Sequence, residues 1–384
     1  MILVTVGGEG LSSRHRQGQD VDEVDRREFL QHAAVTAAAL SGCSPDERSS
    51  ATAKEPPTQP TEEVRPVNVT TLALGMPWQT LDPFLFCVHH LDTYPKGDAQ
   101  MGPVASLAGR QMGSDFSGQD GWSMYHGRIV PGFPRHPHRG FETITVTRQG
   151  FIDHSDSLGA TARYGEGDVQ WMTAGKGIVH AEMFPLRSEV SDNPAELFQV
   201  WLNLPAKSKF ADPHFTMFWK DSVPVHTLKD SAGREVVITT IAGALSGVSP
   251  PAPPPESWAS HTVDDIAVWA IDLSPEATWT LPAAAKGLNR ALYFYRGDTL
   301  DVSGTKVPPN HRASVDSDLP VRLTAGKAPC QLLLLQGRPI GEPVAQHGPF
   351  VMNTKEEIRQ AFQDYQRTGF GGWPWRRDDP VHAR

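Results

Sequence analysis

The stretch GFPRHPHRGFETITVTRQGFIDHSDSLGATARYGEGDVQWMTAGKGIVHAEMFP, residues 132–185, decides the fold of this 384-residue chain. Near its start stands His136-Pro137-His138 and near its end His180-Ala181-Glu182, two pairs of donor side chains with the same one-residue gap. In an extended strand the side chains at positions i and i+2 leave from the same face. Each pair can therefore direct two donor atoms at one point.

The residues between the two pairs follow a strand pattern. Successive side chains alternate between two faces, with Phe141, Thr143, Thr145 and Thr147 on one and Glu142, Ile144 and Val146 on the other. Turn sequences follow at Gln149-Gly150 and at Gly165-Glu166-Gly167-Asp168, as hairpins need. The pattern predicts a run of antiparallel strands. If these strands close into a small barrel, the two pairs meet and offer three imidazoles and one carboxylate.

Such a donor set indicates a metal site. Neutral imidazoles and a carboxylate suit iron, manganese, nickel, copper or zinc, and four protein ligands on an octahedral ion leave two positions for small molecules. The competing interpretation is solvated surface, because a His-x-His in a loop is common without a metal. The 43 residues between His136 and His180 are also too many for spacing alone to establish that the pairs converge.

The same stretch resembles a known family. The strings GFPRHPHRGFETIT (132–145) and GDVQWMTAGKGIVHAEM (167–183) are similar to those of the pirins, a branch of the cupin superfamily. Carried over by position, the resemblance implies four metal ligands, which are His136, His138, His180 and Glu182. In the broader cupin pattern the glutamate at position 142 is a common ligand. Glu142 lies four residues after His138, on the same face of a continuous strand, and is the rival of Glu182.

The resemblance extends from about Leu81 to about Gly372. It implies an all-β fold of two tandem cupin-type β-barrels, a bicupin, with a short C-terminal helix. The helix also follows from the residues, since Thr354 and Glu357 can form a capping box and Gly369 can end it. Its apolar stripe consists of Ile358, Ala361, Phe362 and Tyr365.

Five segments are expected: a signal peptide at 1–42, a flexible linker at 43–66, an N-terminal metal-binding cupin domain at 67–233, a C-terminal cupin domain without a metal motif at 234–346, and a helix and tail at 347–384. Residues 94–125, rich in Gly, Asp, Ser and Gln, look longer than the corresponding pirin connection. An insertion beside the metal is placed to form a lid or to alter substrate choice, and a solvated loop is the alternative.

The N-terminal region carries two export signals in the right order. Arg26-Arg27 precedes the mildly apolar run 33–40, as in twin-arginine signals, and small residues precede Cys43, as in a lipoprotein cleavage box. We expect an exported, periplasmic or cell-envelope lipoprotein whose membrane contact is a lipid anchor at Cys43. The acidic residues ahead of the arginines are atypical, and the alternative is a cytoplasmic protein. Cys87 and Cys330 are expected to be buried free thiols, and a disulfide between them in an oxidising compartment is the alternative.

Composition excludes two further classes of partner. A net charge of −9 without a basic cluster argues against nucleic-acid binding. No apolar run approaches the ~18 residues that cross a bilayer. The expected state is a monomer that acts on small molecules.

The resemblance implies a dioxygenase that uses ferrous iron to open flavonols such as quercetin with O2. Manganese, nickel, copper or zinc are the alternative metals. Glu182 would be the catalytic residue, because imidazoles held on a metal have no free lone pair to accept the substrate's hydroxyl proton. The opposing hypothesis is a non-enzymatic metal-binding redox sensor or envelope interaction protein.

Overall fold

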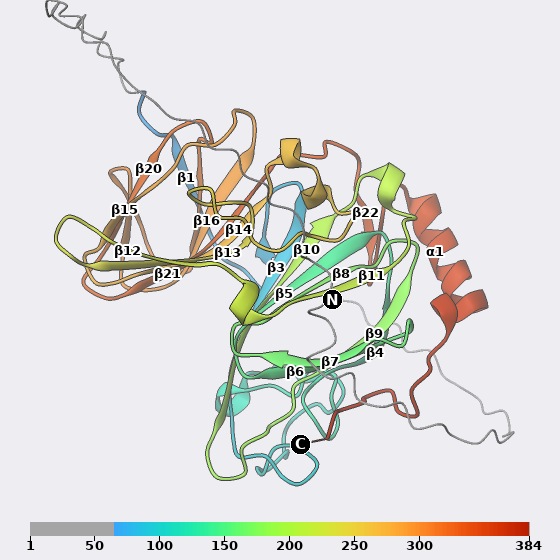
Figure 1. Cartoon of the computed structure of the whole chain (residues 1–384). Coiled ribbons are helices and arrows are strands. Elements are labelled where there is room, and N and C mark those ends of the chain that lie inside the picture. Colours follow the sequence, from blue (N-terminus) through green and yellow to red (C-terminus); the bar gives the residue numbers. More distant parts are fainter. Residues whose placement is uncertain (1–64, 384) are drawn as a thin grey trace, which may run out of the picture. The chain divides into compact units, whose positions relative to one another are not determined.

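The computed structural model of the chain describes residues 65–383. Within them it confirms the predicted fold class: strands run through the sequence and a single α-helix lies near its C-terminal end (Figure 1). Arg26-Arg27, Cys43 and nearly all of the expected linker lie outside the described residues. In the described part, no helix is both long and apolar enough to cross a membrane.

The first barrel contains the stretch with the two donor pairs. Its larger sheet has the strand order β11-β8-β5-β10-β3-β2, and its smaller sheet the order β4-β9-β6-β7. The larger sheet consists of β2 (Trp78–Gln79), β3 (Phe84–Tyr94), β5 (Phe141–Gln149), β8 (Val169–Thr173), β10 (Asn193–Asn203) and β11 (His214–Phe218). The smaller sheet consists of β4 (Gly132–His138), β6 (Phe151–Asp156), β7 (Thr161–Gly165) and β9 (Ile178–Met183).

The second barrel repeats this plan. Its larger sheet has the order β1-β19-β16-β21-β14-β13-β12, and its smaller sheet the order β15-β20-β17-β18. The larger sheet consists of β1 (Val69–Ala73), β12 (Val225–Lys229), β13 (Glu235–Ala242), β14 (Ala267–Leu273), β16 (Asn289–Arg296), β19 (His311–Val315) and β21 (Cys330–Gly337). The smaller sheet consists of β15 (Thr278–Leu281), β17 (Leu300–Val302), β18 (Thr305–Val307) and β20 (Val321–Ala325).

One buried core joins the two barrels. Alternation on β5 turns Ile144 and Val146 away from the first barrel's interior, and they pack with Val268 and Leu333 of the second. Trp78 stacks on Tyr293 in the same core, with 5.5 Å between ring centroids. Cys87 lies in this core and Cys330 in the interior of the second barrel, both as the free thiols that the sequence predicted.

The expected domain limits stay predictions. A strand from the first expected domain pairs with the second barrel, and the C-terminal tail packs on the first barrel. β1 belongs to the segment 67–233 but pairs with β19 of the second barrel. The tail instead packs on the first barrel: Phe350, Ile358 and Phe370 form one cluster with Val179, whose neighbour His180 points to the opposite face of β9. Arg139 also donates to Asp364 of the helix at 2.8 Å.

The C-terminal helix, α1, spans Lys355–Thr368 and begins as the sequence predicted. Thr354 accepts from the backbone of Glu357, whose side chain accepts from the backbone of Thr354. Gly369 ends it in the left-handed conformation, φ 56°. Ahead of α1 lies the two-stranded sheet of β22 (Ala345–His347) and β23 (Phe350–Met352), and the short 3-10 helices are Gln119–Gly121, Ala206–Ser208, Lys220–Ser222, Trp258–Ser260, Thr262–Asp264 and Gly369–Gly371.

Candidate metal centre

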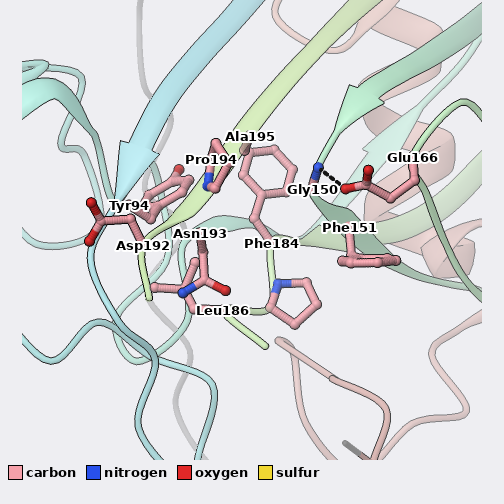
Figure 2. Close-up of a pocket in the computed structure, with 11 residues that line it drawn as sticks. Tyr94, Gly150, Phe151, Glu166, Phe184, Leu186, Asp192, Asn193, Pro194 and Ala195 are labelled. Atoms are coloured by element: carbon pink, nitrogen blue, oxygen red, sulfur yellow. Dashed lines mark hydrogen bonds between the residues drawn. The ribbon is translucent and has the colours of Figure 1, made fainter. Parts of the chain in front are cut away.

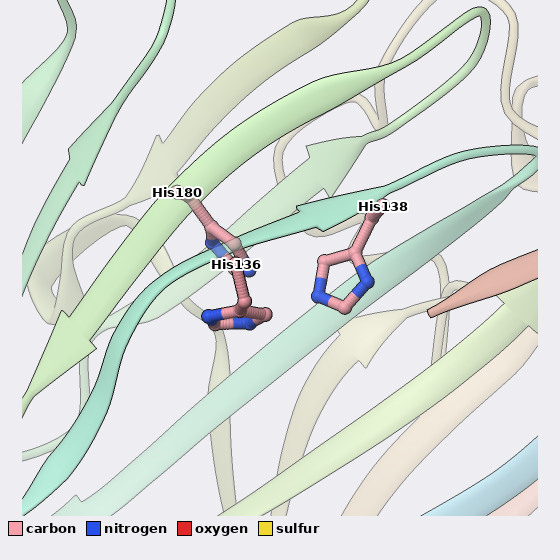
Figure 3. Close-up of side chains that lie close together, drawn as sticks. All are labelled: His136, His138 and His180. Atoms are coloured by element: carbon pink, nitrogen blue, oxygen red, sulfur yellow. The ribbon is translucent and has the colours of Figure 1, made fainter. Parts of the chain in front are cut away.

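The structure brings the three predicted histidines together. Strands β4 and β9 are antiparallel neighbours, and their register sets His136 directly opposite His180. His138 leaves β4 on the same face as His136, so all three rings converge (Figure 3). One ring nitrogen from each lies within 4.8 Å of the other two. Two ligands of one ion, at bonds of about 2.1 Å, are up to about 4.2 Å apart, so the rings stand near binding separation.

The surroundings of the rings also fit a metal. His180 is fully buried, and neither of its ring nitrogens has a hydrogen-bond partner among the described residues. Buried nitrogens without partners are rare and costly in native proteins, and a bound ion would satisfy one of them. Burial lowers the pKa of His138 and His180 well below the usual value and that of His136 to about 4. Neutral imidazole is the form that binds a metal.

Backbone carbonyls orient the other two rings. The Nδ1 of His136 lies 2.9 Å from the carbonyl of Pro134, and that of His138 lies 3.4 Å from the carbonyl of Pro349. A carbonyl only accepts, so in the neutral ring Nδ1 carries the hydrogen and Nε2 keeps the lone pair. His136 is partly exposed while His138 and His180 are buried. The cluster is therefore open on the side of His136.

Glu182 stands beside the cluster on the same face of β9 as His180. Its Oε2 lies 3.8 Å from the Nε2 of His180, which is within the separation that two ligands of one ion can have. The larger sheet also holds this carboxylate, because Gln199 donates to Oε2 at 2.8 Å and Thr145 to Oε1 at 3.4 Å. Burial raises the pKa of Glu182. The position fits a fourth ligand, and that role stays a prediction.

Glu142, the rival ligand, faces elsewhere. Its carboxyl accepts hydrogen bonds from Thr173 at 2.6 Å and from Ser257 at 2.5 Å. The expectation that it shares a face with His138 assumed a continuous strand and is wrong. The chain turns at Gly140, with φ 86°, and β5 begins afresh at Phe141. On β5, Glu142 lies on the face opposite to Thr145, away from Glu182.

The buried carboxyl of Glu142 predicts a pH dependence of stability. Burial raises its pKa from 4.5 to about 7. The folded protein therefore retains a proton that the unfolded chain loses above pH 4.5, so this contribution to stability is present at low pH and lost as the pH rises through 7. Its size is up to about 3 kcal/mol.

The variant Glu142→Gln removes this titration. The free energy of unfolding of wild type minus that of the variant, measured by urea denaturation, should fall by up to about 3 kcal/mol between pH 4.5 and pH 7.5. The subtraction cancels the opposite contribution of the buried histidines, which both proteins share. A pH-independent difference would show that Glu142 is ionised in the folded protein throughout this range.

A further pair beside the site was missed at the sequence level. On β6, His154 lies opposite Glu182 and Asp156 opposite His180. The Nε2 of His154 is 3.1 Å from Asp156, and its Nδ1 is 3.3 Å from Gln170, which contacts Thr145. A buried chain of polar contacts thus reaches Glu182 through Thr145. The signal was present, since His154-Ser155-Asp156 has the same i, i+2 spacing as the two pairs that were singled out.

In residues 65–383, His136, His138 and His180 are the one cluster of potential metal ligands, so the described part of the second barrel contains none. A separate cavity of about 110 Å³ lies between the ends of β3 and β10 and the β5–β6 turn (Figure 2). Glu166 closes one side by accepting from the backbone of Gly150 at 2.8 Å. The cavity includes no residue of the cluster and is smaller than the ~300 Å³ of typical ligand sites.

Two tandem barrels of facing antiparallel sheets, with converging histidines in the first, define a bicupin with one candidate metal site. The comparisons with known proteins agree. The family model described as Pirin matches residues 76–202, and the model described as Pirin C-terminal cupin domain matches residues 268–371. The chain belongs to the pirin family.

The relatives include one named for the family and others named for an activity. A pirin-like protein of Caulobacter vibrioides is 35% identical over 81% of this chain and 96% of its own length. A Pseudomonas aeruginosa protein provisionally named a quercetin 2,3-dioxygenase is 37% identical over 62% of this chain and 79% of its own. Among solved structures, quercetin 2,3-dioxygenase from Acinetobacter baumannii aligns with a TM-score of 0.60 at 27% identity, covering 76% of this chain and 88% of that one.

Proposed function

We propose that this protein is a metal-dependent dioxygenase, with ferrous iron as its metal, that opens flavonol-like aromatic substrates with O2. The observation that carries the proposal is the convergence of His136, His138 and His180 beside the carboxylate of Glu182, open on the side of His136. The names of the Pseudomonas and Acinetobacter proteins support the same reaction class.

The three imidazoles and Glu182 would hold the ion. When bound, such a metal supplies open coordination positions at which oxygen-containing molecules are held and polarised. Iron is the metal that the family resemblance favours, and the donor set also accepts manganese, nickel, copper and zinc.

The protein's own groups would orient the substrate and accept its proton. Among residues 65–383, Glu182 is the one carboxylate with an oxygen within 4 Å of a ring nitrogen of the cluster, and we assign it the proton of the substrate's hydroxyl. Gln199 and Thr145 fix its two oxygens. Trp201 and Phe141 pack against the ring of His138, with centroids 5.3 Å and 5.1 Å away, and exclude water from that side.

Oxygen consumption tests this proposal. The purified chain, stripped with a chelator and reloaded anaerobically with ferrous iron, should consume O2 on addition of quercetin and bleach the flavonol absorbance. Metal-free protein is the control and should do neither. The dioxygenase would be ruled out if the protein bound each of the five metals stoichiometrically and consumed no O2 with any of them.

The alternative function is a non-enzymatic metal-binding sensor or interaction protein. The burial of His138 and His180 favours it, since among the three rings only that of His136 is partly exposed and the cluster offers a substrate little open surface. The absorption spectrum of the metal-loaded protein separates the two functions. A spectrum unchanged by quercetin and by catechol would mean a closed coordination sphere and would support the sensor.

A further inference from the structure

The segment 94–125 is internally braced, although it contains little regular structure. At its centre the guanidinium of Arg110 is fully buried. It donates to Asp115 at 2.8 Å and to the carbonyls of Trp122 at 2.9 Å and Gln119 at 2.6 Å, and it lies 3.4 Å from the centre of the Trp122 ring. A buried guanidinium with this many partners holds one backbone arrangement. The expectation of a plain solvated loop does not describe this segment.

The end of the segment is fixed to the first barrel. Tyr125 has a left-handed backbone, φ 55°, which an aromatic residue adopts only where its surroundings impose it. Its backbone exchanges two hydrogen bonds with Asp115, each of 2.8 Å, and its hydroxyl donates to Asp92 of β3 at 2.7 Å. These contacts fix the backbone of Tyr125 and therefore the direction in which the side chain of the next residue, His126, points.

The result is a continuous aromatic row, formed by Phe116, Tyr125, His126 and Phe133. Ring centroids are 5.2 Å apart for Phe116 and His126, 5.6 Å for His126 and Phe133, and 5.2 Å for Tyr125 and Phe133. Phe133 lies on β4, and its ring is 6.3 Å from that of His136. Phe116, at the other end, is 39% exposed. The row thus leads from solvent to the open side of the histidine cluster.

His126 adds one directed polar atom to the row. Its Nδ1 lies 2.7 Å from the carbonyl of Gly113, so in the neutral ring Nδ1 donates and Nε2 keeps the lone pair. The described residues show a hydrogen bond only at Nδ1. A hydroxyl of a molecule lying along the row could therefore donate to Nε2.

We propose that the aromatic row is a recognition subsite for the part of a polyphenolic substrate that projects away from the metal. Phe116 covers its ring, and Nε2 of His126 accepts a hydrogen bond from its hydroxyl. Phe116 and Tyr125 belong to the segment 94–125 and His126 follows it directly, so this segment determines which phenols are accepted. The inference rests on the proposed function for the class of substrate.

Two variants and two flavonols test the subsite. Phe116→Ala removes the exposed ring. His126→Asn keeps an amide that can donate to Gly113 but has no atom at the position of Nε2. Quercetin carries hydroxyls on its outer rings, whereas 3-hydroxyflavone keeps only the hydroxyl and carbonyl pair that faces the metal. Val190→Ala, on a side chain 83% exposed elsewhere on the first barrel, is the control.

Dissociation constants come from quenching of tryptophan fluorescence with metal-free and metal-loaded protein, and KM and kcat from oxygen uptake. Phe116→Ala should raise Kd and KM for both flavonols about 5- to 10-fold with little change in kcat. His126→Asn should raise them about 5-fold for quercetin and leave 3-hydroxyflavone unchanged. Metal content should match that of Val190→Ala, and both variants should unfold in one cooperative transition well above the assay temperature.

The two proposals fail in different ways. Wild-type Kd and KM in both variants, or equal effects of His126→Asn on the two flavonols, would overturn the subsite whether or not O2 is consumed. If wild type binds quercetin but consumes no O2, the dioxygenase fails, and the quercetin Kd of Phe116→Ala then decides the subsite alone.

Discussion

Replacing His180 by alanine should abolish stoichiometric metal binding and leave the metal-free protein folded. The ring centroid of His180 lies 4.4 Å from that of His136 and 4.8 Å from that of His138, so its loss leaves two imidazoles on one strand. Changes to groups that merely support a ligand lower metal affinity by 10- to 100-fold, so loss of a ligand should lower it by at least about 100-fold.

The effect on stability separates loss of metal from loss of fold. Neither ring nitrogen of His180 has a hydrogen-bond partner among residues 65–383, so alanine removes two unsatisfied groups along with the packing of the ring. Metal should therefore raise the melting temperature of wild type and not that of the variant. His311→Ala, in the second barrel, is the matched control and should bind one metal ion. Retention of one tightly bound ion in His180→Ala would show that the metal lies elsewhere.

Replacing Glu182 by glutamine should keep much of the metal and lower kcat by about 10²- to 10⁴-fold, the usual contribution of a proton-accepting group. The amide has the shape of the carboxylate, and its oxygen can still accept from Gln199. It cannot accept the proton of a substrate hydroxyl. Metal analysis measures how much metal the variant retains, and fluorescence quenching measures its affinity for quercetin. Oxygen uptake in a single turnover measures the rate of the chemical step by itself.

Glu142→Gln makes the same chemical change in the rival carboxylate and is the matched control. Glu142 is bound to Thr173 and Ser257 on the other face of β5, so its variant should retain kcat near neutral pH. Full ring-opening activity in Glu182→Gln would remove Glu182 from the reaction. Lost activity in Glu142→Gln with normal activity in Glu182→Gln would exchange the two roles.

The sequence predicted those features that depend on neighbouring residues. The i, i+2 spacing placed His136 and His138 on one face, and the cap at Thr354 placed the start of α1. The register that sets His136 opposite His180 is a property of barrel closure. Several hairpins together fix this register, and the number of residues between the two motifs is not enough to predict it. The family resemblance supplied that step.

The sequence did not predict how Glu142 faces or that His154 and Asp156 lie beside the site, because both depend on where neighbouring strands are placed. Glu142 was grouped with His138 by counting residues along a strand that turns at Gly140, where the count restarts. His154 and Asp156 were passed over because their neighbours on β9 become known only once β6 is placed. The bracing of the segment 94–125 was hidden for a similar reason, since Asp92, which accepts from Tyr125, lies on another element.

Each end of the described chain packs on the barrel formed by the other half of the sequence, which affects whether the two halves can fold separately. β1 completes the sheet of the second barrel, while α1 and Phe370 cover the outer face of the strand that carries His180. A cut at the expected limit between residues 233 and 234 would leave the first half without its covering helix and the second half without both of its edge strands, β1 and β12. Separately expressed halves should therefore be insoluble, and co-expression should restore a complex in which each fragment completes the other.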